Sequence, residues 1–467
     1  MFREKLSSSV YATSFEEVYL APGMASLEPS EIDLSTFFSR NTRILIPISS
    51  SPMDTVTEEE MAIALALLGG IGVVHRNIPV ERQVEIVRRV KSAPLIRTRS
   101  LFISSMDTCY RALEIMRSMF LRDIPVVDDG RVVGHIRYSD AIESCRGFET
   151  LVGKLMKPPK SIEITRLNDA RRDLIRGESD TIAVISREGF YLGTLVFQDL
   201  FEDYTPAIGR DGGLVVGAAI SPFDFNRVKA LDPITDVLVS DVAHAHNINV
   251  LKHLSKISRE TSSDLVVGNI ASYQAVRDAV EYIERIDGFR VGLGGGSICI
   301  TPEVSGAYMP TLYAVASVRD AVEDMNLRIP VIADGGIRSS ADIVRALAAG
   351  ASSVMLGSLL AGTDEASAPL ISLEGELYKP YRGMASKSAM ERRFAVDRYA
   401  RVSKRVAEGI EVVIPYKGSV YKIVRDLVEG IRAGLGYAGA SSIRDLWEKA
   451  VFIRTRSRDP RGSSKQV

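Results

Sequence analysis

Eight short apolar segments recur along the chain, and helical patterns follow most of them. They read RILIPISS from Arg43, GIGVVH ending at His75, LVVGAA from Leu214, DVLVSDV from Asp236, DLVVGNI from Asp264, FRVGL from Phe289, PVIADGG from Pro330 and SVMLGS from Ser353. Most are apolar throughout instead of alternating, as in parallel strands covered on both faces. Eight such strands separated by helices predict an α/β fold of the (β/α)8, or TIM, barrel type, whose active sites lie where the strands end.

The segment between the second and third of these strands does not fit the barrel pattern and contains a repeat. RDIPVVDDGRVVGHIRYSDAI from Arg122 is echoed by SDTIAVISREGFYLGTLVFQDLF from Ser179. Each copy has a strand, a turn with glycine, a second strand and an aspartate that opens a helix. We therefore expect residues 1–92 and 205–467 to form the two parts of the barrel, and residues 93–204 to form an insert.

A long charged stretch, 381–418, follows the last predicted strand and is too irregular to belong to the core. Long excursions at the mouth of a barrel are usually lids or binding loops, so we expect a mobile flap here. The chain ends in IRTRSRDPRGSSKQV, a basic sequence typical of a frayed tail.

Charge and cysteine content restrict the partners and the compartment. The 58 basic and 59 acidic residues nearly cancel, so no global field favours nucleic acid or an anionic membrane. Neither a signal-peptide pattern nor an apolar stretch long enough to cross a bilayer is present, which predicts a cytoplasmic protein. The three cysteines lack zinc-site spacing and disulfide density. We expect Cys109 and Cys145 to be free, buried, apolar residues.

The third cysteine lies in an unusual stretch, GLGGGSICITPE, at 292–303. Glycines here bring backbone groups close to a ligand and place Cys299 on an exposed loop after the sixth strand. This position favours a nucleophile, which acts as the thiolate. The stretch is not a dinucleotide fingerprint, because Ser297 occupies the position of the third glycine in GxGxxG. A nicotinamide cofactor would therefore bind without a Rossmann domain.

Two adjacent loops predict a phosphate site. ADGGI after the seventh strand and LGSL after the eighth supply Gly335, Gly336, Gly357 and Ser358 where barrels often bind phosphate. Asp334 would then lie within reach of a ribose; its alternative role is to cap a helix.

The longest motifs resemble one family over almost the full chain, the IMP dehydrogenase and GMP reductase superfamily. They are SSPMDTVTE at 50–58, GGIGVVHRN at 69–77, GGGSICITPEV at 294–304, IADGGIRSSADIVRALAAGASSVMLGSLLAGT at 332–363 and YRGM at 381–384. The resemblance implies oxidation of inosine 5'-monophosphate (IMP) to xanthosine 5'-monophosphate with NAD, toward guanine nucleotides. The intermediate would be a covalent thioimidate on Cys299, hydrolysed after the flap closes.

The same resemblance implies a role for individual residues. The catalytic residues would be Cys299, Thr301, Arg398 and Tyr399, the last two activating water from the flap. The substrate-binding residues would be Ser297, Asp334, Gly336, Gly357, Ser358, Tyr381, Gly383, Met384 and Glu408. The cofactor-binding residues would be Asp241, Asn269, Gly292 and Gly294. The backbone carbonyls of Gly294, Gly296 and Cys299 match a potassium site. A homotetramer or octamer is usual for the family.

The repeat in the insert resembles a tandem pair of CBS modules, which commonly bind adenine or guanine nucleotides. The resemblance places Ser139 and Asp140 at a ribose; the alternative is that Asp140 only caps a helix.

Two other functions remain open. A GMP reductase would convert GMP to IMP with NADPH, and GMASKSAM from Gly383 is closer to some reductases. The Arg398-Tyr399 pair and SSPMDTVTE favour the dehydrogenase. A non-catalytic nucleotide sensor acting through the CBS pair is the second alternative, and the intact thiol loop disfavours it.

Overall fold

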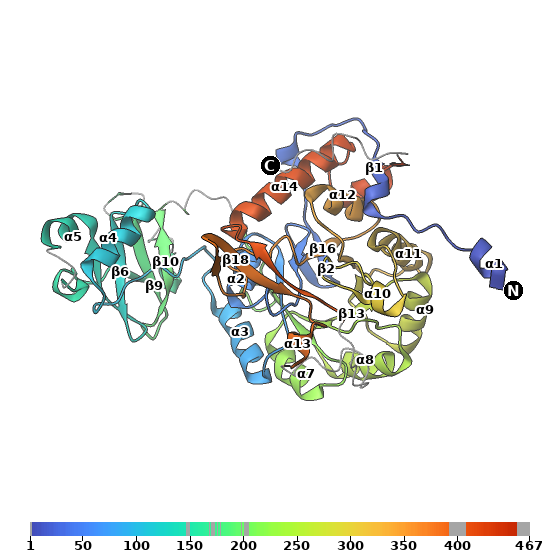
Figure 1. Ribbon diagram of the computed structural model, residues 1–467, viewed down its shortest axis with the longest axis horizontal. Helices are drawn as coiled ribbons and strands as arrows, with labels where there is room; N and C mark the ends of the chain where they lie inside the picture. Colours follow the sequence, from blue (N-terminus) through green and yellow to red (C-terminus); the bar gives the residue numbers. More distant parts are fainter. Residues whose placement is uncertain are drawn as a thin grey trace. The chain divides into compact units, whose positions relative to one another are not determined.

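The computed structural model describes residues 2–145, 150–167, 169, 173–174, 176–177, 179–197, 199, 205–391 and 408–454. The chain forms two compact units, one made of Met1–Ser92 with Thr205–Val467 and one made of Ala93–Tyr204 (Figure 1). None of the helices in the described ranges is both long and apolar enough to cross a membrane.

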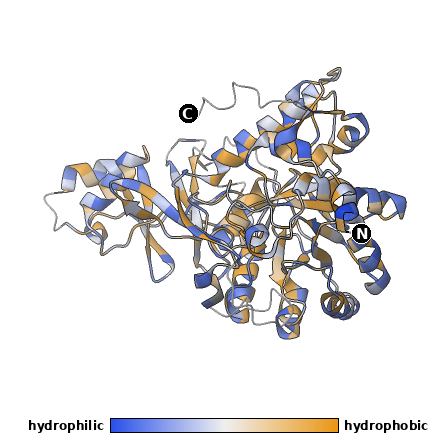
Figure 2. Ribbon diagram, turned by 45° about the vertical axis from the view of Figure 1, so that its right-hand side comes forward, coloured by the Kyte–Doolittle hydropathy of each residue, from blue (hydrophilic) through white to orange (hydrophobic). Residues whose placement is uncertain are grey.

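The larger unit is built on a closed barrel of eight parallel strands, in the order β11, β12, β13, β14, β15, β16, β4, β5. The strands are β4 (Ile48–Ser50), β5 (Ile71–Val74), β11 (Val216–Ile220), β12 (Val237–Ser240), β13 (Asp264–Ile270), β14 (Gly288–Val291), β15 (Val331–Asp334) and β16 (Ser353–Leu356). Nearly all their residues are buried, and the apolar colouring concentrates in the barrel (Figure 2). Each of the eight apolar segments contributes one strand, so the predicted (β/α)8 barrel is confirmed.

Buried aspartates hold the N-terminal ends of the strands together. Asp236 accepts a hydrogen bond from Val216 N (2.9 Å), and Asp287 accepts one from Leu265 N (2.9 Å). Each carboxylate therefore ties the start of its own strand to the strand before it. This end of the barrel is fixed by side-chain bonds, and the opposite end is left for ligands.

Helices α8 (Ile248–Glu260), α9 (Tyr273–Tyr282) and α12 (Ser340–Ala348) cover the barrel. Each begins after a polar residue whose side chain accepts a backbone N–H of the first turn: Asn247, Ser272 and Ser339. Because Ser339 caps α12, the alternative role of Asp334 as a helix cap is wrong.

The smaller unit contains the two copies of the repeat. The first has α4 (Cys109–Ser118), β6 (Asp123–Asp128), β7 (Arg131–Arg137) and α5 (Tyr138–Ser144), and the second has β8 (Ser161–Glu163), β9 (Thr181–Ile185) and β10 (Tyr191–Val196). Equivalent aspartates bind across the copies: Asp123 accepts from Asp180 N (3.0 Å), and Asp180 accepts from Arg122 N (2.8 Å). Asp140 lies inside α5, whose N-cap is Arg137, so it is not the helix cap.

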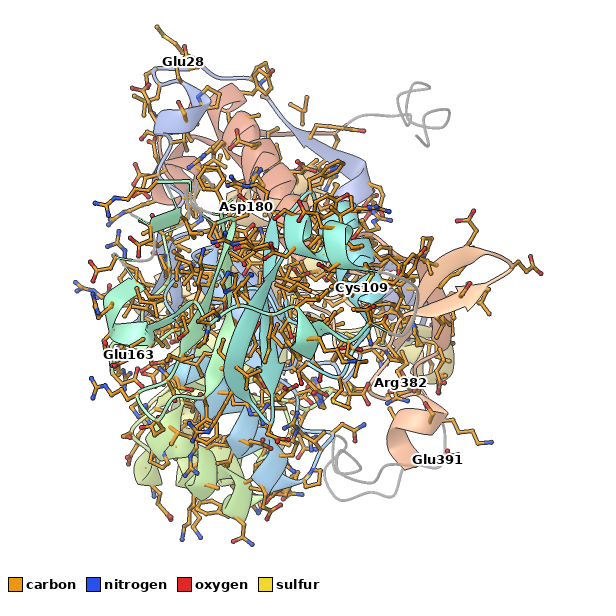
Figure 3. All side chains as sticks on the ribbon, turned by 90° about the vertical axis from the view of Figure 1, so that its left-hand side faces the viewer. Glu28, Cys109, Glu163, Asp180, Arg382 and Glu391 are labelled. Atoms are coloured by element: carbon orange, nitrogen blue, oxygen red, sulfur yellow. A yellow bond between two sulfur atoms is a disulfide. The ribbon has the colours of Figure 1, made fainter. Side chains whose placement is uncertain are left out.

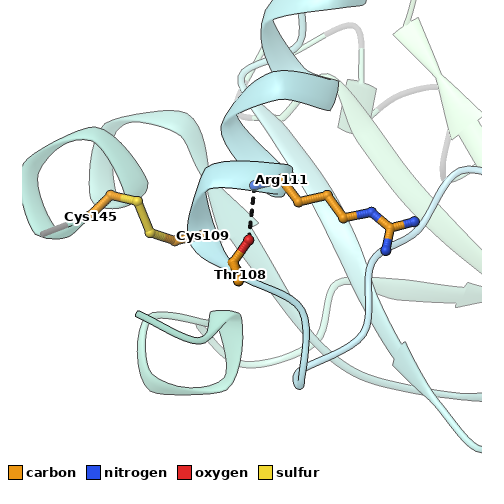
Figure 4. The surroundings of a disulfide bond; sticks show 4 residues. All are labelled: Thr108, Cys109, Arg111 and Cys145. Atoms are coloured by element: carbon orange, nitrogen blue, oxygen red, sulfur yellow. Dashed lines mark hydrogen bonds between the residues drawn. A yellow bond between two sulfur atoms is a disulfide. The ribbon is translucent and has the colours of Figure 1, made fainter. Parts of the chain in front are cut away.

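The expectation that Cys109 and Cys145 are free was wrong, because they form a disulfide (Figure 4). Cys109 is the first residue of α4 and Cys145 directly follows α5. Packing of the two helices brings the Cα atoms within 5.9 Å, inside the range that a disulfide needs. The two cysteines are 36 positions apart in the sequence, so no local pattern indicated that they pair.

Reducing this disulfide is expected to destabilise the insert. Loop-closure entropy for a separation of this length contributes about 3–4 kcal/mol to the free energy of unfolding. Hydrogen exchange in peptides from α4 and α5 should speed up under dithiothreitol or in Cys145→Ser. The single tryptophan, Trp447, lies in the larger unit, so its fluorescence should not change. Equal exchange in oxidised and reduced wild type would contradict this prediction.

Candidate active site

A pocket opens at the C-terminal end of the barrel strands, and every residue predicted for the barrel site that the structure describes lines it. These are Asp241, Asn269, Gly292, Gly294, Gly296, Ser297, Cys299, Thr301, Asp334, Gly335, Gly336, Gly357, Ser358, Tyr381, Gly383, Met384 and Glu408. Arg398 and Tyr399 lie outside the described residues. Arg290 and the loop Ser51–Met53 also line the pocket, although neither was predicted as a site residue.

The loop that carries Cys299 is held from two sides. Its backbone turns tightly, with Cys299 N donating to Gly296 O (3.0 Å). The segment 408–410 then pairs with it: Ile300 N donates to Glu408 O (2.9 Å), and Ile410 N donates to Ile298 O (3.1 Å). The half-buried thiol is therefore presented on a loop with a defined backbone.

A short chain of hydrogen bonds starts at the thiol. Cys299 Sγ donates to Thr301 Oγ1 (3.1 Å), which in turn donates to Glu408 Oε2 (3.1 Å). Glu408 is buried although it belongs to the long charged stretch 381–418. This arrangement can carry a proton between the sulfur and a carboxylate, which is what a nucleophile needs to become a thiolate. The resemblance had placed Glu408 at the purine edge, and the structure adds its contact with Thr301.

The predicted phosphate loops have the backbone that anion binding requires. Gly335 and Gly336 have φ of 92° and 75°, which favours glycine. A Cβ on Gly357 would lie 2.8 Å from the Tyr381 hydroxyl, so the two residues are closely packed. Burial raises the pKa of Tyr381 to about 12, outweighing a hydrogen bond with Ser297 that lowers it. The hydroxyl therefore keeps its proton at neutral pH and can donate to a phosphate.

Two aspartates and two arginines form a buried network beside the thiol loop. Arg290 donates from Nε to Asp334 Oδ2 (2.9 Å) and from Nη1 to Asp241 Oδ1 (3.2 Å). Arg76 reaches Asp241 Oδ2 (3.3 Å) and its backbone oxygen (3.0 Å). Burial alone would lower the pKa of Arg290, but Asp334 and Asp241 together raise it. The two arginines and two aspartates carry opposite formal charges that balance within the network.

Asn269 fixes the aspartate that is expected to meet the ribose. The register of β13 shifts between Gly268 and Ile270, and such a shift re-aims the side chain at its centre. Asn269 Nδ2 donates to Asp334 Oδ2 (2.8 Å) and Gly292 O (3.0 Å). Because Arg290 Nε donates to the same Oδ2 atom, the two hydrogen bonds together fix the orientation of the Asp334 carboxylate.

Asp241, Asn269, Gly292 and Gly294 share this pocket with the phosphate loops, as a cofactor next to a nucleotide substrate would require. Within the described part of the chain, no three His, Cys, Asp or Glu residues are grouped to hold a metal ion.

Comparison with known proteins agrees with this geometry. A family model described as "IMP dehydrogenase / GMP reductase domain" matches residues 12–464. The inosine-5'-monophosphate dehydrogenase of Korarchaeum cryptofilum is 43% identical over 94% of this chain and 93% of its own, and that of Thermoplasma acidophilum is 40% identical over 97% and 94%. A crystal structure of a GMP reductase variant from Trypanosoma brucei is 32% identical, with a TM-score of 0.75 over 98% of this chain and 100% of that chain. The same reductase in complex with guanosine 5'-monophosphate has a TM-score of 0.70. The chain therefore belongs to the IMP dehydrogenase / GMP reductase family of oxidoreductases.

Proposed function

We propose that the protein oxidises IMP to xanthosine 5'-monophosphate with NAD. The bonds from Cys299 through Thr301 to Glu408 support a thiol nucleophile beside a phosphate site. The dehydrogenase names of relatives at 36–43% identity, against 32% for the reductase structures, favour IMP oxidation over GMP reduction.

The substrate would lie along the pocket from the phosphate loops to the thiol. Ser297, Gly336, Gly357, Ser358 and Tyr381 would bind the phosphate. Asp334 would accept hydrogen bonds from the ribose hydroxyls. The purine would then reach Cys299, with Gly383, Met384 and Glu408 along its edge.

The chemistry has two halves. In the first, the Cys299 thiol loses its proton through Thr301 to Glu408, and the thiolate adds to C2 of the purine. The C2 hydrogen then leaves as a hydride, which NAD accepts when bound against Asp241, Asn269, Gly292 and Gly294. In the second half, water attacks C2 of the resulting thioimidate, and xanthosine 5'-monophosphate and the thiol are released.

Water attack needs a base, and by resemblance Arg398 and Tyr399 supply it from the segment outside the described residues. Arg398→Ala should lower kcat about 100-fold, the usual range for losing a general base. The first hydride transfer should survive, so a covalent adduct on Cys299 should accumulate and appear in the intact mass of quenched enzyme. Lys387→Ala, a change in the same charged stretch, serves as the control. An adduct level equal to that of wild type would argue against the assignment.

Potassium is proposed at the carbonyls of Gly294, Gly296 and Cys299, since carbonyl oxygens can replace the hydration shell of this ion. The Gly296 oxygen already accepts one hydrogen bond, from Cys299 N, and a carbonyl has a second lone pair. The bound ion would stabilise the turn that carries the thiol. Higher activity in potassium than in sodium at equal ionic strength would support this site.

The GMP reductase structures keep the conversion of GMP to IMP with NADPH as the second candidate. Two absorbance assays of the nicotinamide separate the functions. A rise with IMP and NAD supports the dehydrogenase, and a fall with GMP and NADPH supports the reductase. No change in either assay would favour the nucleotide sensor.

The insert 93–204 is proposed to regulate the barrel by binding an adenine or guanine nucleotide. In the CBS-like site, Asp140 Oδ2 lies 3.8 Å from Lys157 Nζ, so a carboxylate for a ribose and a cation for a phosphate are adjacent. We further propose a cytoplasmic homotetramer or octamer without nucleic-acid or membrane partners.

A further inference from the structure

A second buried ion pair, distinct from the network of Asp241 and Asp334, lies at the rim of the pocket. Arg382 donates to Asp54 from Nε (3.0 Å) and Nη2 (2.6 Å), forming a two-pronged pair. The side chain of Asp54 is 1% exposed and that of Arg382 17% exposed. Asn77, which is fully buried, donates a third hydrogen bond to Asp54 Oδ2 (2.9 Å).

Stability alone does not account for such a pair, because apolar residues of similar volume often give the folded protein equal stability. The pair instead fixes the position of one segment of the chain relative to the barrel. Asp54 follows β4 and Asn77 follows β5, so both belong to the rigid barrel. Arg382 ends β18 (Glu376–Arg382), a strand outside the barrel, and Figure 3 shows it near the helix α13 (Lys387–Glu391).

Arg382 and the barrel residue Asn77 both reach that helix as well. Arg382 Nη1 donates to Ser388 Oγ (3.0 Å), and Asn77 Nδ2 donates to Ala389 O (3.3 Å). The pair thus fastens the end of β18 and the start of α13 to the barrel. Between these two elements lie Gly383, Met384 and Ala385, which line the pocket.

Backbone hydrogen bonds connect the segment 383–385 to 408–410, and 408–410 in turn to the loop that carries the thiol. Gly383 N donates to Ile410 O (3.1 Å), and Glu408 N donates to Ala385 O (3.1 Å). The other edge of 408–410 pairs with the loop of Cys299, as described above. A Cβ on Gly383 would lie 3.2 Å from Gly409 Cα, so the backbones are closely packed. The position of the thiol loop therefore depends on where Arg382 is held.

We propose that Asp54, acting through Arg382, is a positioning residue that holds the thiol loop and Glu408 in their reactive arrangement. The proposal deepens the proposed function, on which its effect on turnover rests. Neither residue needs to touch the substrate.

The test compares Asp54→Asn, Arg382→Gln and the double variant with Asp287→Asn in the full-length protein. Asp287 is a matched control, because it is 1% exposed and pairs with Arg285 (2.6 Å) at the opposite end of the barrel. Hydrogen exchange of the Cys299 and Ile300 amides reports on the loop without needing turnover. We expect it to be at least ten-fold faster in Asp54→Asn and unchanged in Asp287→Asn. Turnover with IMP and NAD should fall about 30-fold in Asp54→Asn and less than two-fold in the control, since misplacing a reacting group by about 1 Å is costly.

The double variant should be no worse than the worse single variant, because the two residues act as a unit. If Asp54→Asn does not fold, the Arg382→Lys variant tests the proposal instead. Lysine keeps the positive charge but cannot make two parallel hydrogen bonds to the Asp54 carboxylate. This variant should speed exchange of the same amides at least three-fold. Unchanged loop exchange in the folded variants, or equal effects in the control, would overturn the proposal. Inactive wild type with ordinary loop protection would instead refute only the proposed function.

Discussion

Replacing Cys299 with alanine is expected to abolish formation of reduced nicotinamide from IMP, with a loss of at least about 10⁴-fold in kcat. Without the sulfur no bond from residue 299 to C2 can form, and the adjacent hydroxyl of Thr301 is a neutral group already bound to Glu408 (3.1 Å), so it does not replace a thiolate. The loop should keep its shape, because its backbone bonds to 408–410 do not involve the side chain. Absorbance at saturating IMP and NAD measures the loss, and Trp447 fluorescence checks the fold.

Thiol labelling gives an independent control. Cys299 is the free cysteine of the chain, since Cys109 and Cys145 are paired, so iodoacetamide should attach once to native protein. Saturating IMP should protect the thiol, and Cys145→Ser should retain the absorbance signal. Substantial turnover by the Cys299→Ala variant would exclude covalent catalysis at this position.

The sequence was sufficient for the barrel because each strand carries its own local signal. Segments such as DLVVGNI and SVMLGS are apolar throughout, and a buried parallel strand requires that pattern regardless of its neighbours. The thiol loop was predictable for the same reason, since four glycines beside one cysteine are a local signal of backbone that approaches a ligand. Resemblance to a family then supplied roles that no local pattern contains.

The contacts that could not be predicted from the sequence are those between residues far apart along the chain. Arg290 was visible as a charge inside the apolar segment FRVGL, which signals a buried partner, but its partners Asp241 and Asp334 are 49 and 44 residues away. Thr301 and Glu408 are 107 residues apart, and Asp54 and Arg382 are 328 apart. These residues come together only because the closed barrel places the C-terminal ends of its strands at one end of the fold.

The buried network gives the second large effect, expected for Asp334→Asn. Asp334 Oδ2 accepts from Arg290 Nε (2.9 Å) and Asn269 Nδ2 (2.8 Å), and an amide cannot accept as strongly as a carboxylate. Two arginines would then share the one remaining carboxylate, Asp241. Breaking a buried pair in this way costs about 3–5 kcal/mol, so the melting temperature should also fall.

Catalysis should fall in addition to stability, because Asp334 is also the proposed acceptor for the ribose. Hydrogen bonds to a charged group contribute about 1.5–3 kcal/mol each, so kcat/KM for IMP should fall about 10³-fold. Asp264→Asn, a buried aspartate at the opposite end of the barrel, is the control for stability alone.

Substrate analogues separate the two effects of Asp334→Asn. Wild type should discriminate strongly against IMP lacking a 2'- or 3'-hydroxyl, because each deletion removes one bond to the carboxylate. The Asp334→Asn variant should treat IMP and the deoxy analogues nearly alike, whereas Asp264→Asn should discriminate as wild type does. If the variant keeps the full preference for IMP, some other group binds the ribose. The carboxylate would then serve only to balance Arg290, and the orientation proposed for the substrate would have to be reversed or shifted along the pocket.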